Sequence, residues 1–213
     1  MCFSAEASLA TLIIGLVGSY FVYSLGKPTD RIIALFLGYV SLMQGIELIL
    51  WKHQTCDAAH KGVSVLGAIL NTLQPIVLGL LLLAISPRQT NAFEIKSIMV
   101  VYLACIMLYG IQYIFGDFMC TTPRKDDPHL VWNWTIMPYY EVSWLLYIAA
   151  AVSLCILGMP SLNAGIAYGG FYLITMIASI ILYKRQDMGA MWCFFTVFAP
   201  MLYLGYRKLG LPF

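Results

Sequence analysis

Glu47 is a carboxylate inside an otherwise apolar run, the stretch "SLMQGIELILWKHQ" from Ser41 to Gln54. Two polar side chains, Gln44 and Trp51, share its helical face at spacings of three and four residues. A charge within hydrocarbon costs about 2.5–3.5 kcal/mol on insertion scales, so such residues usually face a protein interior or a wet cavity. Glu47 also falls near the carboxyl end of its helix, where the helix dipole disfavours a negative charge, and it therefore requires a partner.

Two more carboxylates are expected at the same depth of the membrane. Glu6 begins the first apolar run, and Glu141 lies a turn or two into the fifth, next to Tyr140. Because consecutive spans alternate in direction, the three acids fall in the same third of the membrane. A pocket lined by carboxylates, amides and phenols would suit a small cation, a proton or a small polar solute. Two close carboxylates also raise one another's pKa, which suits proton exchange.

Structural explanations of the same three acids stay open. Glu6 and Glu141 would also fit helix amino termini in the headgroup region, where the dipole favours an acid. Glu47 would equally fit a buried pair that only holds helices together.

Four side chains that can bind metal follow the second apolar run: His53, Cys56, Asp57 and His60. In a helix, offsets of three, four and seven residues would bring them to one face, and these residue types bind zinc or copper. A loop is the competing interpretation, in which Cys56 pairs with Cys120 or Cys2 in an oxidising compartment. A third alternative gives these residues no special role.

The composition indicates what surrounds these residues. Of 213 residues 61% are hydrophobic and 10% are charged, and the mean hydropathy is +0.83. A soluble domain has about a quarter of its residues charged, so the chain is expected to be an integral membrane protein in a lipid bilayer. The net charge of +2 comes from scattered basic residues, which argues against binding to nucleic acid. The first six residues hold no Lys or Arg, so the first apolar run is expected to be a retained span rather than a cleaved signal.

Apolar runs long enough to cross a bilayer predict an all-α, polytopic bundle of seven transmembrane helices in a single domain, residues 1–213. The expected spans are about 5–25, 32–52, 63–86, 96–115, 136–158, 161–183 and 188–206. The one long connection, residues 116–135, holds Trp132 and Trp134, which suit an interfacial belt. Pro75 and Pro200 lie within the third and seventh spans, where neighbouring helices can satisfy the freed carbonyls.

The distribution of basic residues favours one orientation. Lys and Arg are equally numerous on the two sides, but the first span has none before it and has Lys27 and Arg31 just after it. We therefore expect the amino terminus and the long loop outside and the carboxyl terminus in the cytoplasm. Gly165 and Gly169 form a small-xxx-small pair on the sixth span, which permits close helix contact either within the chain or between subunits of a homo-oligomer.

Several functional classes lack the residues they require. The expected span 188–206 holds no lysine, so no retinal Schiff base is expected. All three histidines fall at span ends or in loops, so a bis-His haem within the membrane is not expected either. No nucleophile–base pair stands out, which makes an enzyme the least favoured class.

The opening "MCFSAEASL" and the stretch "QGIELILW" resemble the hallmark motifs of an uncharacterised family of multi-pass membrane proteins. Its members begin MCFSA and carry an HQxxExxxW-like motif in the second span. Met43 stands where the family often has His, which weakens the idea of a His–Glu proton pair or metal site. The family brings no established activity, but the resemblance implies that the residues of its two motifs belong together: Cys2, Phe3, Ser4, Glu6, Gln44, Glu47 and Trp51.

The sequence favours two candidate functions. The first is a transporter, channel or sensor that handles a small cation, proton or small polar solute at an outer-side acidic pocket. Glu47 would be the central carboxylate, with Gln44, Trp51, Glu6, Glu141 and Tyr140 around it. The second is a membrane scaffold, or a subunit of a larger membrane assembly, in which the carboxylates only hold helices together.

Overall fold

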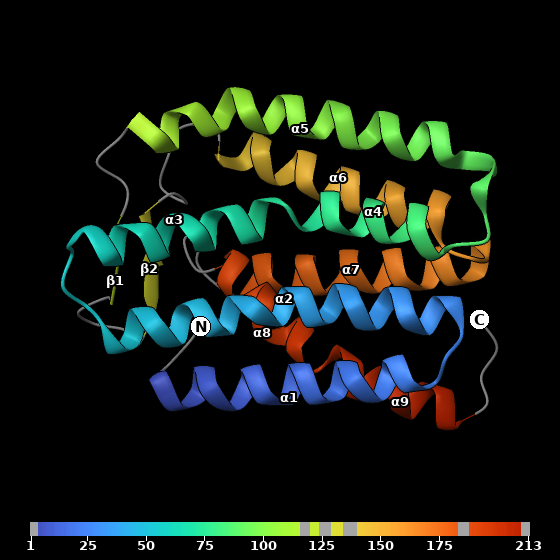
Figure 1. Ribbon diagram of the computed structural model, residues 1–213, viewed down its shortest axis with the longest axis horizontal. Coiled ribbons are helices and arrows are strands. Elements are labelled where there is room, and N and C mark those ends of the chain that lie inside the picture. Colours follow the sequence, from blue (N-terminus) through green and yellow to red (C-terminus); the bar gives the residue numbers. More distant parts are fainter. Residues whose placement is uncertain (1–3, 116–119, 124–128, 134–139, 183–187, 210–213) are drawn as a thin grey trace.

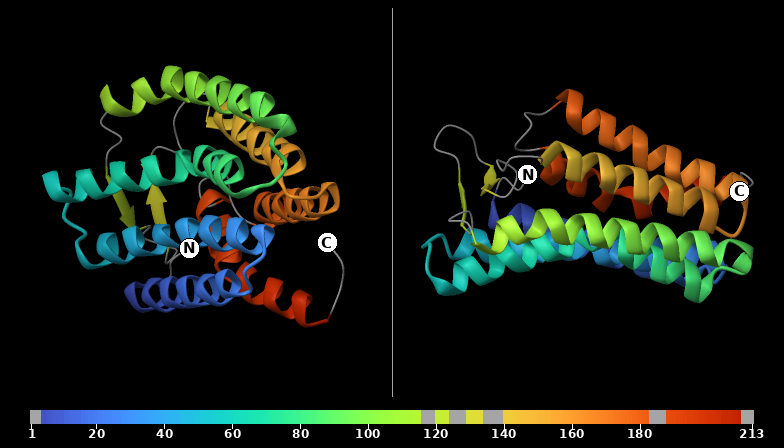
Figure 2. Two further views of the ribbon diagram at one scale, coloured as in Figure 1. Left: turned by 45° about the vertical axis from the view of Figure 1, so that its right-hand side comes forward. Right: turned by 90° about the horizontal axis from the view of Figure 1, so that it is seen from above.

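The computed structural model (Figure 1) describes residues 4–115, 120–123, 129–133, 140–182 and 188–209. Long helices run side by side along the long axis of the molecule, as Figure 1 shows. The right-hand view of Figure 2 shows two layers. Helices α6 and α7 lie behind the layer that contains α2 to α5, as seen from the direction of Figure 1. The helices are α1 (Ala5–Ser24), α2 (Pro28–Lys52), α3 (Ala58–Thr72), α4 (Gln74–Ile85), α5 (Ala92–Phe115), α6 (Tyr140–Gly158), α7 (Leu162–Leu182), α8 (Met188–Val197) and α9 (Ala199–Lys208), with a 3₁₀ turn η1 (Gln89–Asn91) before α5.

Polar side chains define where the first three helices begin. The Ser4 hydroxyl accepts the Ala7 N–H at 3.2 Å, and the Asp57 carboxylate accepts the His60 N–H at 2.9 Å. In the first turn of α2 the Asp30 carboxylate accepts the Lys27 N–H at 3.2 Å. Each contact satisfies a donor that the start of a helix leaves without an intrahelical partner.

Prolines interrupt the two predicted spans that contain them. Helices α3 and α4 meet at a bend of 48° around Leu73, two residues before Pro75. A proline has no N–H and clashes with the preceding turn, so the helix bends there. Tyrosines from neighbouring helices satisfy carbonyls near the bend, since Tyr39 donates to Leu70 O at 3.0 Å and Tyr102 donates to Thr72 O at 2.8 Å. Helix α8 likewise ends just before Phe198, and α9 begins at the residue before Pro200.

The prediction of seven spans is supported only in part. Within the described residues, α1, α2, α6 and α7 are long and apolar enough to cross a membrane, and the bent pair α3–α4 makes a fifth if it counts as one span. The structure thus agrees with a multi-pass helical membrane protein of four or five candidate spans. The predicted span 63–86 is a bent helix pair, and 188–206 corresponds to two helices of 10 residues each.

The centre of the bundle is α2. About 61% of its most apolar window is buried, against 33–39% for the other three long candidate spans. The side chains of Ile32, Phe36 and Val40 are almost fully buried along its length. A helix that is apolar and covered on most sides belongs to the protein interior, and its polar residues must therefore find partners within the protein.

A small β-hairpin covers one end of the bundle. Strands β1 (Thr121–Pro123) and β2 (Leu130–Trp132) pair antiparallel, with Thr121 opposite Trp132. The long loop therefore contains regular structure that the sequence did not predict. Trp132, expected in an interfacial belt, is instead 2% exposed and lies against Gly67 on α3. We call this end of the bundle, where α1 begins and α2 ends, the hairpin end (Figure 1). The opposite end of the bundle, where α2 begins and α9 ends, is called the far end.

The small-residue pair on α7 makes an internal contact. A Cβ placed on Gly165 would lie 2.6 Å from the carbonyl oxygen of Cys155 on α6, a distance that real Cβ atoms essentially never show. Only glycine lets the two helix backbones approach this closely. Of the two alternatives for this motif, the structure has the contact within the chain.

Candidate functional site

Burial separates Glu47 from the other predicted acids. Gln44 is fully buried, Glu47 is 1% exposed and Trp51 is half-buried, so the face predicted from their spacing does point inward. Glu6 and Glu141, by contrast, are exposed in the first turns of α1 and α6. The helix dipole favours an acid at that position, which is the simpler explanation of both. The side chain of Tyr140 lies outside the described residues.

Gln44 links the first two helices. Thr11 on α1 donates its hydroxyl hydrogen to Gln44 Oε1 at 2.7 Å, and both side chains are buried. A hydrogen bond between side chains 33 residues apart fixes how α1 and α2 face one another. Thr11 played no part in the sequence prediction, because only the folded packing of the two helices brings it to Gln44.

A second set of polar side chains lies at the bend between α3 and α4. Gln74, the first residue of α4, donates to Asn71 Oδ1 at 3.4 Å and accepts the phenol of Tyr147 on α6. Tyr172 on α7 in turn donates to the Tyr147 hydroxyl at 2.6 Å. Gln74, Tyr147 and Tyr172 are all buried, so this chain of hydrogen bonds crosses the interior from α4 through α6 to α7.

Cys193 on α8 lies at the same bend. Its thiol is 3.9 Å from Asn71 Oδ1. Cys193 is buried, and it lies next to a polar group rather than among apolar side chains alone. We refer to Gln44, Glu47, Asn71, Gln74, Tyr147, Tyr172 and Cys193 together as the central polar network.

Aromatic rings enclose one side of the network. Trp192 lies next to Cys193 in the chain, and its ring centroid is 4.7 Å from that of Tyr172 and 6.0 Å from that of Tyr147. Its indole N–H donates to Thr175 Oγ1 at 3.0 Å. Because the ring packs against two phenols and is held by a hydrogen bond, the hydroxyl groups of Tyr147 and Tyr172 have a fixed direction.

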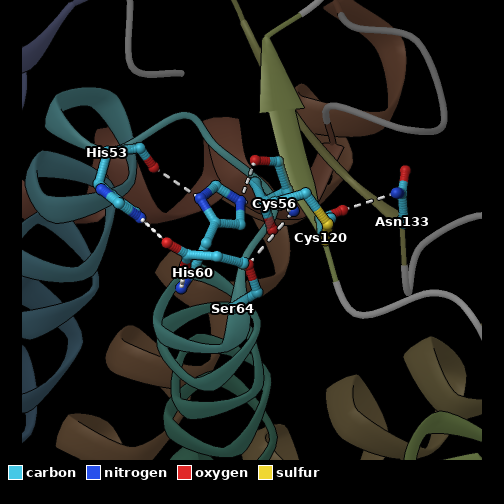
Figure 3. The surroundings of a disulfide bond; sticks show 8 residues. His53, Cys56, His60, Ser64, Cys120 and Asn133 are labelled. Atoms are coloured by element: carbon cyan, nitrogen blue, oxygen red, sulfur yellow. Dashed lines mark hydrogen bonds and ion pairs between the residues drawn. A yellow bond between two sulfur atoms is a disulfide. The ribbon is translucent and has the colours of Figure 1, made fainter.

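The predicted metal ligands are arranged around a disulfide (Figure 3). Cys56 is bonded to Cys120, which is 64 residues further along the chain, with 5.9 Å between the Cα atoms. Asn133 donates its amide hydrogen to the Cys120 carbonyl at 2.6 Å, which ties β2 to the same point. The bond therefore attaches the hairpin to the loop between α2 and α3.

Both nitrogens of the buried His60 ring contact backbone carbonyls. Nδ1 lies 2.6 Å from the oxygen of His53, and Nε2 lies 2.7 Å from the oxygen of Thr121 in β1. His53 Nε2 is 2.8 Å from the Asp57 carboxylate. The hydrogen bond from the His60 N–H, together with that from the His53 side chain, lowers the pKa of Asp57. These contacts fix the loop rather than converge on one point.

The disulfide removes Cys56 from the set of metal ligands, because a thiolate is the form that binds metal. Within the described part of the chain, no group of three or more His, Cys, Asp or Glu side chains could hold a metal ion. Of the three alternatives for this segment, the structure has the disulfide, and of the two partners considered for Cys56, namely Cys120 and Cys2, it uses Cys120.

A second buried carboxylate, at the far end, was missed by sequence reasoning. Asp30 is fully buried, and besides the Lys27 N–H it accepts the Tyr203 hydroxyl at 2.6 Å. Arg207 Nη2 lies 3.5 Å from its other oxygen. In the sequence Asp30 stands in a polar turn, "GKPTDR", and nothing local shows that α9 covers it.

Comparison with protein-family models, with curated proteins and with solved structures finds no match for this chain. The resemblance to the MCFSA family stays a prediction, and the function is argued from the geometry of the site.

Proposed function

We propose that this chain is a seven-span membrane protein that binds and releases a proton at Glu47, as part of a transporter, channel or sensor. The observation that carries the proposal is a carboxylate buried to 1% exposure within the central candidate span, in a bundle whose interior also holds a chain of hydrogen-bonded amide and phenol groups. Ionisable residues inside membrane spans are costly, and they usually belong to ion or proton pathways.

The seven spans of the proposal use every long helical segment. Beyond the four or five candidate spans, α5 has 24 residues, and α8 and α9 together would make one interrupted span like α3–α4. The disulfide supports the proposed orientation. Disulfides persist in oxidising compartments, so the hairpin end, and with it the beginning of α1, would face the outside.

A proton suits this site better than a solute of larger size. The described polar side chains in this part of the interior include amides, phenols and a thiol, among them those of Gln44, Gln74 and Cys193. They can stabilise a carboxyl group in either protonation state through dipoles that already exist. A buried group that changes charge changes the local balance of forces when it titrates, which is what a proton-driven element requires.

The bend between α3 and α4 is the part of the fold that we expect to respond to a change in the charge of Glu47. Asn71 and Gln74 lie on opposite sides of the bend around Leu73, one in α3 and the other in α4. In many transporters, interrupted helices carry the site near the middle of the membrane and move relative to the rest of the bundle. Because α2 packs against both α3 and α4, a change in the charge of Glu47 would act on the two helices that meet at this bend.

The test is proton movement into liposomes that contain the purified protein and an enclosed pH-sensitive dye. An imposed pH gradient is expected to collapse faster with the wild type than in empty liposomes, and Glu47→Gln is expected to abolish the difference. Glu141→Gln makes the same chemical change at an exposed acid and is expected to keep the wild-type rate.

The scaffold function predicts a different pattern. Wild-type liposomes would then be no more permeable than empty ones, and Glu47→Gln would lower the free energy of unfolding by well over about 1 kcal/mol, the loss expected when only the charge is removed. That combination would overturn the proposal and assign Glu47 to holding helices together. Equal rates in the wild type and in Glu47→Gln would also overturn it.

A further inference from the structure

A cavity lies at the far end of the bundle, between α2, α7 and α9. Its volume is about 310 Å³, at the lower end of the range of about 300–1,000 Å³ that is usual for small-molecule sites. The lining is almost wholly apolar and comes mainly from Ile33, Leu37, Tyr168, Phe171, Leu202 and Tyr203. None of these residues belongs to the central polar network.

The cavity opens toward the surface that the helices would present to lipid. Ile33 and Leu37 form a buried floor, whereas Leu202 on α9 is 63% exposed and Ala167 on α7 is exposed. In a membrane protein, an apolar cavity with an apolar rim on this surface is accessible from the hydrocarbon layer. An acyl chain is therefore the molecule that is already present at its entrance.

One edge of the cavity is positively charged. Tyr203, which lines it, is hydrogen-bonded to Asp30, and the Arg207 guanidinium holds the same carboxylate. Arg207 has five N–H donors, and its side chain is 23% exposed, so it can bind a second anion beside Asp30. This end of α1, α2 and α9 carries four basic residues and one acid: Lys27, Arg31, Arg207, Lys208 and Asp30.

We propose that this cavity binds an anionic phospholipid, with one acyl chain between α7 and α9 and the phosphate at Arg207 and Lys208. Basic pockets between membrane helices on the cytoplasmic side hold anionic headgroups in this way. The proposal rests on the chain lying in a bilayer and is independent of proton binding at Glu47.

The experiment measures the melting temperature of detergent-purified protein while phosphatidylglycerol or phosphatidylcholine with the same acyl chains is added. A lipid that binds only the folded protein raises the melting temperature. Phosphatidylglycerol is expected to act at a concentration about tenfold lower than phosphatidylcholine, because one charge-assisted contact is worth about one factor of ten in affinity. The preference is expected to shrink in Lys208→Gln, which removes the charge of an exposed side chain.

Two pairs of variants separate this site from general lipid contact. Ala167→Phe fills the cavity and is expected to abolish the effect of phosphatidylglycerol, whereas Ala10→Phe adds the same ring to an exposed position of α1 and is expected to keep it. Lys96→Gln removes an exposed charge from α5 and is expected to leave the preference unchanged. Equal effects of the two lipids on the wild type, or an unchanged preference in Ala167→Phe, would overturn the proposal.

Discussion

The two ends of α2 hold buried carboxylates in opposite surroundings. Asp30 lies in the first turn, where the helix dipole favours a negative charge, and it is bonded to a backbone N–H, a phenol and a guanidinium. Glu47 lies near the carboxyl end, where the dipole opposes the charge, and it shares its buried face of α2 with the amide of Gln44. The first arrangement stabilises a fixed charge, and we propose that the carboxyl group in the second exchanges a proton.

The largest expected effect on stability comes from replacing the first of these two acids, and the second provides the comparison. Asp30→Ala leaves Arg207 and Tyr203 without their buried partner and is expected to lower the free energy of unfolding by about 3–5 kcal/mol. Glu47→Gln keeps the shape and removes only the charge, so a loss of about 1 kcal/mol is expected. Denaturant unfolding of both variants in the same detergent measures the difference. A larger loss in Glu47→Gln than in Asp30→Ala would contradict the comparison.

The disulfide joins segments that are far apart in the sequence at the hairpin end, as the Asp30 ion pair does at the far end. Replacing Cys56 and Cys120 by Ser is expected to cost about 2–4 kcal/mol, because the bond closes a long loop between residues 64 apart in the sequence. Thermal unfolding with and without reductant checks this. The reductant should lower the wild-type melting temperature to that of the double variant and should not change the variant. A wild type that is insensitive to reductant would rule the bond out.

The contact of the hairpin with α3 is expected to have a smaller effect. A Cβ on Gly67 would lie 2.7 Å from the Trp132 ring, so Gly67→Ala is expected to cost about 1–3 kcal/mol. Gly62 is on the same helix with nothing within 4 Å of its Cβ position, and Gly62→Ala should instead stabilise by about 0.5–1 kcal/mol. Equal effects of the two substitutions on the melting temperature would contradict the packing of Trp132.

The smallest expected effect is a dependence of the melting temperature on pH that comes from the Asp57 carboxylate. Because its folded pKa is below the ordinary value of 3.8, its contribution to stability is present above that value and is lost as pH falls through the folded pKa. The melting temperatures of the wild type and of Asp57→Asn should therefore differ at neutral pH and converge below about pH 4. A difference that grows on acidification would contradict the assigned cap and His53 contact.

Sequence reasoning predicted the helical membrane class, the approximate helix bounds and the inward face of Gln44 and Glu47, because apolar periodicity records which side of a helix is covered. It also predicted that Cys56 and Cys120 lie on the same side of the membrane. It did not find Thr11, Tyr172 or Asp30, because their partners lie 33, 25 and 173 residues away and only packing brings them together.

The grouping of the three acids was the weakest step. Equal depth in the membrane does not fix which way a side chain points, and Glu6 and Glu141 point outward. The hairpin was missed for a related reason, since its strands have three residues each and carry little pattern.

Infrared difference spectroscopy of the protein in lipid between acidic and neutral pH tests the central claim most directly. It detects the carbonyl stretch of a carboxyl group when that group gains a proton. A band that rises on acidification in the wild type and in Glu141→Gln, but is missing in Glu47→Gln, is the predicted result. An identical spectrum in the wild type and in Glu47→Gln would show that Glu47 does not exchange a proton, and would contradict the account.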